Sequence, residues 1–79
     1  MNIKTSILQI CNASDPYMMP HDVLRTEIET RHRAPVGDAE YQAALKSLLS
    51  KGMIDYEVDQ ITLDKRYRIT GPGKAYLNN

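Results

Sequence analysis

The spacing of the hydrophobic residues changes at Gly52. Before this glycine, apolar side chains recur as on one face of a helix that Asp38 can cap: Tyr41, Ala44, Leu45, Leu48 and Leu49. After it, apolar residues alternate with acidic ones, as in a strand with one buried side: Ile54, Tyr56 and Val58. Because the helical period gives way directly to the strand period, a helix must be followed at once by a hairpin. The sequence therefore predicts an α+β fold.

Two further helices are predicted ahead of this one. The first can be capped by Asn2, and its apolar side consists of Ile3, Ile7, Ile10 and Cys11. The second begins at Pro20, which has no N–H to lose at a first helical position, and carries Asp22 in its first turn. It should end near 31–33, ahead of Pro35. Its apolar side consists of Val23, Leu24 and Ile28.

A second alternating run, 66–69, predicts the return strand of a hairpin. The expected register brings acidic and basic side chains together on the outer face: Val58 opposite Tyr67, Asp59 opposite Arg66 and Glu57 opposite Arg68. The apolar positions change parity after the first strand, so a turn or bulge is expected near 59–60. Finally, 71–73 should lead into a short helical turn that sets Tyr76 and Leu77 against the core.

The composition limits what such a chain can do. Its 79 residues fit a single domain, 1–79, with a thin core and no large enclosed cavity. Ten Lys plus Arg and ten Asp plus Glu cancel, so any attraction to nucleic acid has to come from local patches. The single cysteine, Cys11, cannot form an intramolecular disulfide and fits a buried thiol. We expect a cytoplasmic protein with no membrane partner, because no apolar run suits a signal peptide or a membrane span.

The order of three helices, a glycine and a hairpin with a basic return strand is that of a winged helix-turn-helix domain. Two segments carry a closer resemblance, Ala44-Leu45-Lys46-Ser47-Leu48-Leu49-Ser50-Lys51-Gly52-Met53-Ile54 and Tyr67-Arg68-Ile69-Thr70-Gly71-Pro72-Gly73-Lys74-Ala75-Tyr76-Leu77. Over residues 39–77 the chain resembles bacterial winged-helix regulators of the PadR and MarR type. The resemblance implies a small winged helix-turn-helix with three helices, a two-stranded hairpin wing and a short C-terminal helical turn.

The same resemblance implies a DNA-binding transcriptional regulator of bacterial, phage or plasmid type. In that family the third helix enters the major groove of double-stranded DNA, while the preceding loop and the wing touch phosphates. By position, groove contacts fall on Gln42, Ala43, Lys46 and Ser47, and glutamine and lysine suit adenine and guanine edges. Glu40 lies beside them and suits phosphate poorly. Phosphate contacts fall on two basic clusters: Arg31 and Arg33, and Lys65, Arg66 and Arg68.

PadR and MarR proteins carry further long helices that form their dimer and its ligand pocket, and none follows Leu77. Tight binding to an operator is therefore expected to need self-association as a homodimer, a second protein on the DNA, or cooperative neighbours. For the same reason no small-molecule ligand is expected.

Other interpretations stay open beside DNA binding. Neutral net charge and the acidic start of the third helix also suit a winged helix that binds a protein, and Glu57 and Asp59 can neutralise the wing arginines. An enzyme is not expected, because no phosphate loop, nucleophile elbow or catalytic carboxylate pattern occurs. Neither a metal nor a cofactor is expected, since Cys11, His21 and His32 lack metal-ligand spacing. Among the tyrosines, Tyr17 alone is expected to have an exposed role, and Tyr41, Tyr56 and Tyr67 should face the core.

Overall fold

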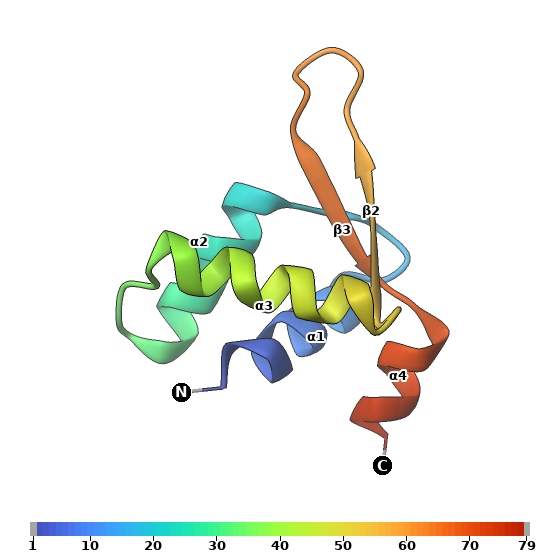
Figure 1. Cartoon of the computed structure of the whole chain (residues 1–79), viewed down its shortest axis with the longest axis horizontal. Coiled ribbons are helices and arrows are strands. Elements are labelled where there is room, and N and C mark those ends of the chain that lie inside the picture. Colours follow the sequence, from blue (N-terminus) through green and yellow to red (C-terminus); the bar gives the residue numbers. More distant parts are fainter. Residues whose placement is uncertain (1, 79) are drawn as a thin grey trace.

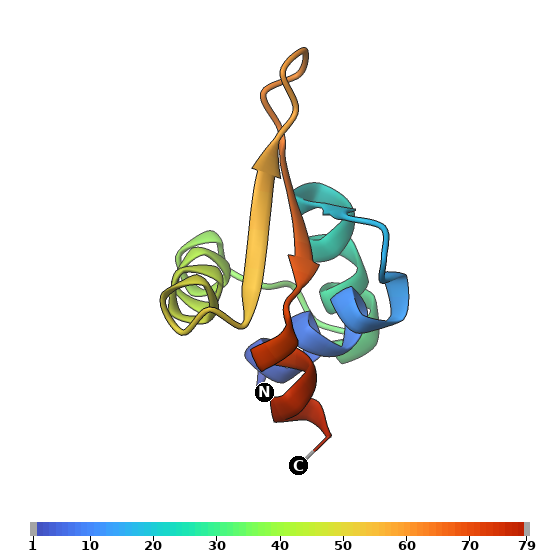
Figure 2. The same ribbon diagram turned by 90° about the vertical axis from the view of Figure 1, so that its right-hand side faces the viewer.

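The computed structural model describes residues 2–78 and has the predicted α+β architecture (Figure 1). The elements in chain order are α1 (Ile3–Ser14), β1 (Met19–Pro20), α2 (His21–His32), α3 (Asp38–Ser50), β2 (Ile54–Val58), β3 (Lys65–Ile69) and α4 (Gly71–Leu77). The hairpin of β2 and β3 projects beyond the helices, and α4 lies at its base (Figure 1). In Figure 2, α3 (green to yellow) lies to one side of the hairpin and α2 (teal) to the other. None of the helices within 2–78 is long and apolar enough to cross a membrane.

The helix ends follow local chemistry, with two differences from prediction. Asn2 caps α1 as expected, because its Oδ1 accepts the Thr5 N–H at 3.3 Å. Pro20 is the N-cap of α2 rather than its first residue. Asp38 is the first residue of α3 and Gly37 is its N-cap, because the Gly37 carbonyl accepts the Tyr41 N–H at 2.9 Å. The Asp38 carboxylate pairs with the guanidinium of Arg25 on α2 and does not cap the helix.

The sheet has three strands in the order β1-β3-β2, all antiparallel. Sequence reasoning missed β1, since a strand of two residues that ends in proline has no alternation to detect. The expected register is wrong by two residues, because Val58 pairs with Lys65 and Tyr56 with Tyr67. The turn occupies 59–64, one residue earlier than the 60–65 left by the expected pair of Asp59 and Arg66: Asp59 N–H donates to the Asp64 carbonyl at 2.9 Å, and Leu63 N–H to the Asp59 carbonyl at 2.8 Å.

The core lies between α1, α2, α3 and one face of the sheet. The predicted core residues Cys11, Leu24, Ile28 and Tyr41 are buried there. Four side chains expected on the core are instead exposed, namely Val23, Tyr56, Val58 and Tyr76. For β2 the reason is plain in Figure 1, because beyond Ile54 the strand extends past the helices that would cover it.

One arginine ties α2 to the start of α3. Arg25 Nη2 donates to the Val36 carbonyl at 2.6 Å, and Nη1 lies 3.3 Å from Asp38 Oδ1. The guanidinium also lies over the Tyr41 ring, 5.7 Å from its centroid. These three contacts fix the angle between the two helices, and Arg33 closes α2 in the left-handed conformation, with φ 53°.

Candidate nucleic-acid interface

The exposed side of α3 presents two rows of side chains. Residues one helical turn apart lie above one another, so Gln42 and Lys46 form one row and Ala43 and Ser47 the other. Gln42, Ala43 and Lys46 are exposed, and Ser47 is half-buried. Gln42 faces the hairpin across a cleft. Ala43 lines a different groove, on the side of α1 and α4, together with Glu40.

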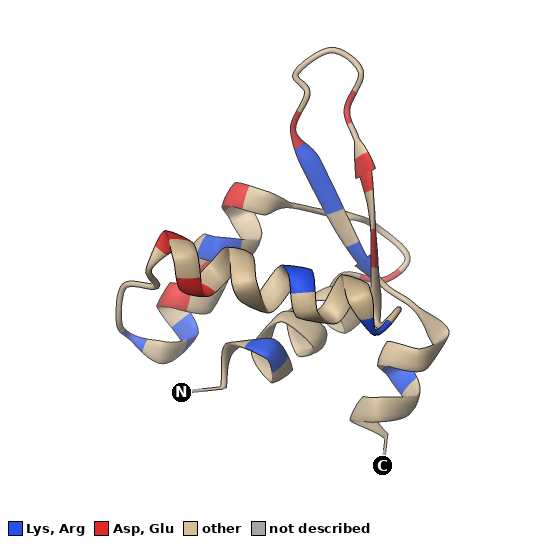
Figure 3. Ribbon diagram, in the orientation of Figure 1, with Lys and Arg blue, Asp and Glu red and all other residues tan. Residues whose placement is uncertain are grey.

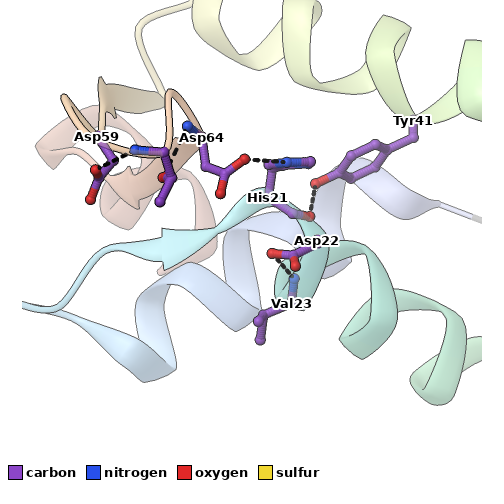
Figure 4. A network of polar contacts seen from close by, with 7 residues as sticks. His21, Asp22, Val23, Tyr41, Asp59 and Asp64 are labelled. Atoms are coloured by element: carbon purple, nitrogen blue, oxygen red, sulfur yellow. Dashed lines mark hydrogen bonds and ion pairs between the residues drawn. The ribbon is translucent and has the colours of Figure 1, made fainter.

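The cleft between α3 and the hairpin has a volume of about 250 Å³ and is lined by His21, Gln42, Leu63, Asp64, Lys65 and Tyr67. Figure 4 shows the polar contacts that connect His21 of this cleft to Tyr41 and Asp64. The Tyr41 hydroxyl donates to the His21 carbonyl at 2.8 Å, which joins α3 to the start of α2. His21 Nε2 lies 3.7 Å from Asp64 Oδ1, which joins α2 to the hairpin turn. Sequence reasoning did not place His21 or Asp64 beside α3, because that proximity depends on the pairing of β1 with β3.

The two faces of the hairpin differ in charge. Successive side chains on a strand point to opposite faces, so Lys65 lies on the same face as Tyr67, toward the helices, while Arg66 and Arg68 lie on the outer face. Arg66 Nη2 pairs with Asp59 Oδ2 at 2.9 Å, and Arg68 Nη2 with Asp55 Oδ2 at 3.5 Å. Lys65 instead lies over the Tyr56 ring, 5.3 Å from its centroid. Of the three wing cations, only Lys65 therefore faces the cleft beside α3.

The other basic cluster lies elsewhere. Arg31 is in the last turn of α2 and donates to Gln9 Oε1 on α1 at 2.9 Å, and Arg33 caps the helix. In Figure 3 the basic residues around the α2–α3 connection and those on β3 lie toward opposite ends of α3. Both arginines are exposed. The structure therefore brings Gln42 and Lys65 together at the cleft, with Lys46 one turn further along α3, and separates them from Arg31 and Arg33.

Carboxylates surround much of the wing. The stretch 52–64 contains Asp55, Glu57, Asp59 and Asp64 and no Lys or Arg. Asp59 organises the turn, because its Oδ1 accepts the N–H groups of Ile61 at 2.8 Å and Thr62 at 3.0 Å. Hydrogen bonds from Thr62 and Ile61 lower the pKa of this carboxyl below its usual 3.8.

No group of three His, Cys, Asp or Glu side chains within 2–78 is placed to hold a metal ion. His32 is the last residue of α2, and its Nε2 lies 2.6 Å from the Ser6 hydroxyl on α1. Cys11 is buried, and burial raises its pKa to about 12.

Two solved structures of other proteins share the fold of this chain. No protein-family model and no curated protein matches the chain. RosR of H. salinarum, in a structure grown from NaBr, is similar with a TM-score of 0.84 and 15% identity over 99% of this chain and 67% of that one. The TA0346 protein of Thermoplasma acidophilum, to which a role as transcriptional regulator is ascribed, is similar with a TM-score of 0.77 and 19% identity over 96% and 71%. With three helices, a hairpin at the end of the third and a short helix after it, this chain has a winged helix-turn-helix fold.

Proposed function

We propose that the protein is a DNA-binding transcriptional regulator that places α3 in the major groove. The observation that carries this proposal is the row of Gln42 and Lys46 on α3, exposed beside the cleft that also holds Lys65. Within residues 2–78, Lys46 makes no ion pair, so its charge is available to a ligand. The fold shared with the T. acidophilum protein supports the same role.

Each side chain of this surface has a chemical role in the proposal. Gln42 can pair with the N6 and N7 edge of adenine, and Lys46 can donate to guanine. Ala43 offers a methyl group to thymine. Ser47 is half-buried and serves a phosphate better than a base. Lys65 faces the cleft and donates to the backbone at its edge.

The four arginines among the predicted phosphate contacts are expected to contribute differently to DNA binding. Arg31 and Arg33 supply phosphate contacts at the far end of α3, on the side of the α2–α3 connection. Arg66 and Arg68 are held by Asp59 and Asp55 on the outer hairpin face, so a phosphate has to displace a carboxylate to reach them. We therefore expect the wing to contribute less to affinity than α3.

Fluorescence anisotropy with a labelled 20-base-pair duplex, measured across salt concentrations, tests the proposal. The slope of log affinity against log salt falls by about 0.9 for each phosphate contact removed. We expect Lys65→Ala to flatten the slope by about that amount, whereas Lys46→Ala should weaken binding and relax one guanine position of the site. Lys4→Ala is the matched control, since Lys4 is an exposed lysine on the far side of α3 from the cleft. The proposal fails if the protein binds no duplex at low salt, or if all three variants behave alike.

Sequence preference is tested separately from phosphate binding. Duplexes selected from a random library should share a short motif, and Gln42→Ala should relax one position of it by about 1–3 kcal/mol of discrimination. Selection that returns no motif would limit the protein to sequence-independent binding. The bacterial, phage or plasmid origin, the cytoplasmic location and the homodimer stay predictions.

A winged helix that binds a protein instead of DNA is the second candidate. The observation that favours it is the wing, where four carboxylates outnumber three cations and two of those cations are paired. Hydrogen exchange distinguishes the two functions. Duplex DNA should protect amides of α3 under the proposed function, and should protect none under the alternative.

A further inference from the structure

A groove of about 450 Å³ lies on the outer side of the hairpin, between β2, β3 and the loop that precedes β1. Tyr17 and Met18 form one wall, and Glu57, Val58 and Asp59 form the other, with Arg66 between them. Arg66 is on the outer face of β3, whereas the cleft beside α3 contains Lys65 and Tyr67 of the inner face. The groove and the proposed DNA surface are therefore on opposite sides of the sheet.

The walls of this groove are built by fixed contacts. Tyr17 is 78% exposed, yet its N–H donates to the Ser14 carbonyl at 2.8 Å. The residue two before it, Asp15, pairs with Lys74 Nζ on α4 at 3.0 Å. On the far wall, Asp59 holds both the turn and Arg66. A phenol ring is thus presented to solvent from an anchored loop, which lowers the entropic cost of binding against it.

The charge of the groove selects its ligand. Asp59 is already engaged by Arg66, but Glu57 makes no ion pair and no side-chain hydrogen bond within residues 2–78. Its free carboxylate shares the groove with the Tyr17 ring, and both attract a cation. Met18 adds apolar surface, and Ile61, which is 92% exposed, follows directly after Asp59 and Gln60 of the groove.

We propose that this groove docks a segment of another protein in which lysine or arginine side chains alternate with aliphatic ones. The cation lies between Glu57 and the Tyr17 ring, and the aliphatic side chains pack on Met18 and toward the exposed Ile61. Nucleic acid suits this surface poorly, because two carboxylates, Glu57 and Asp59, line the groove beside one cation, Arg66, which Asp59 already engages. Docking here takes Arg66 away from DNA but leaves α3 uncovered, and the inference holds whether or not DNA is the ligand of α3.

The test is a titration of the ¹⁵N-labelled chain with a ten-residue synthetic peptide that alternates leucine with lysine and arginine. We expect saturable shifts confined to 17–18, 57–60 and Arg66, and at least tenfold weaker binding of a peptide with glutamine in place of the cations. Glu57→Lys and Tyr17→Ala should each weaken binding about tenfold, the loss of one charge-assisted or cation–π contact.

Asp55→Lys is the matched control. It changes the net charge by the same amount as Glu57→Lys, but Asp55 pairs with Arg68 and does not line the groove. We expect its affinity to stay close to that of the unmodified chain, and circular dichroism verifies that the variants fold. Equal losses in both charge variants, shifts centred on α3, or equal binding of the glutamine peptide would each overturn the proposal. Self-association that Glu57→Lys abolishes in sedimentation experiments, or groove shifts caused by duplex DNA, would assign the groove to another occupant and overturn it as well.

Discussion

Replacement of Gly73 by alanine tests how closely α4 approaches the hairpin base. Gly73 is a buried residue in the first turn of α4, and a Cβ added there would overlap the Met53 carbonyl oxygen and lie 2.7 Å from Ile69 Cγ1. The carbonyl oxygen of Met53 cannot move freely, because it accepts the Thr70 N–H at 3.1 Å. The methyl group therefore displaces either α4 or the start of β2.

Overpacking of this kind costs about 1–3 kcal/mol, from which the better helix propensity of alanine recovers up to about 1 kcal/mol. We expect Gly73→Ala to lower the free energy of unfolding by about 1–2 kcal/mol, or the Tm by about 4–16 °C for a domain of this size. Urea and thermal unfolding followed by circular dichroism measure it. Gly71→Ala is the control, since no atom lies within 4 Å of its added Cβ. If the two variants are equally stable, α4 does not pack against Met53 and Ile69 as described.

Three further outcomes follow from buried or bonded groups. Tyr41→Phe leaves the His21 carbonyl without its 2.8 Å partner and should cost about 1–3 kcal/mol in urea unfolding, whereas an unchanged midpoint would show that water replaces the hydroxyl. The Cys11 thiol should react with a disulfide reagent at pH 8 only in denaturant. Because burial raises its pKa from 9.0 to about 12, stability should also fall as pH rises above 9.0, and rapid labelling of the folded chain would contradict both. The pKa of Asp59 is below its usual 3.8, so its contribution to stability is present above that pH and is lost as pH falls further. Asp59→Asn should therefore flatten the acid limb of the stability profile, and an unaltered limb would count against the turn contacts.

The helices were predictable because their signals are local. The apolar spacing that ends at Gly52 places Tyr41 and Leu45 on the buried side of α3, and Gly52 adopts φ +70° just beyond the C-cap, as a helix stop requires. The register of the hairpin was not predictable in the same way. A shift by two residues keeps every side chain on its face and still opposes acidic and basic residues, so the register depends on where the turn closes, which is between 58 and 65.

The residues of the candidate site could be predicted from the sequence, but which of them lie close together could not. Gln42 and Lys46 follow from their positions on one helix. The alternation of side chains along a strand predicts that Lys65 lies on the opposite face from Arg66 and Arg68. It does not predict which of these two faces the helices cover. The placement of Arg31 against α1 depends on how α1 and α2 pack, which no local pattern encodes.

The contacts of Arg25 have a consequence for how binding preferences could change over time. The tilt of α3 relative to the rest of the domain depends on a side chain outside that helix, through a fork that holds Val36 and Asp38 at once. Lysine would keep the charge but offers a single point of attachment, so the helix would settle at a new inclination. A single substitution of Arg25 would thus re-orient the exposed side of α3 without changing any residue on that helix.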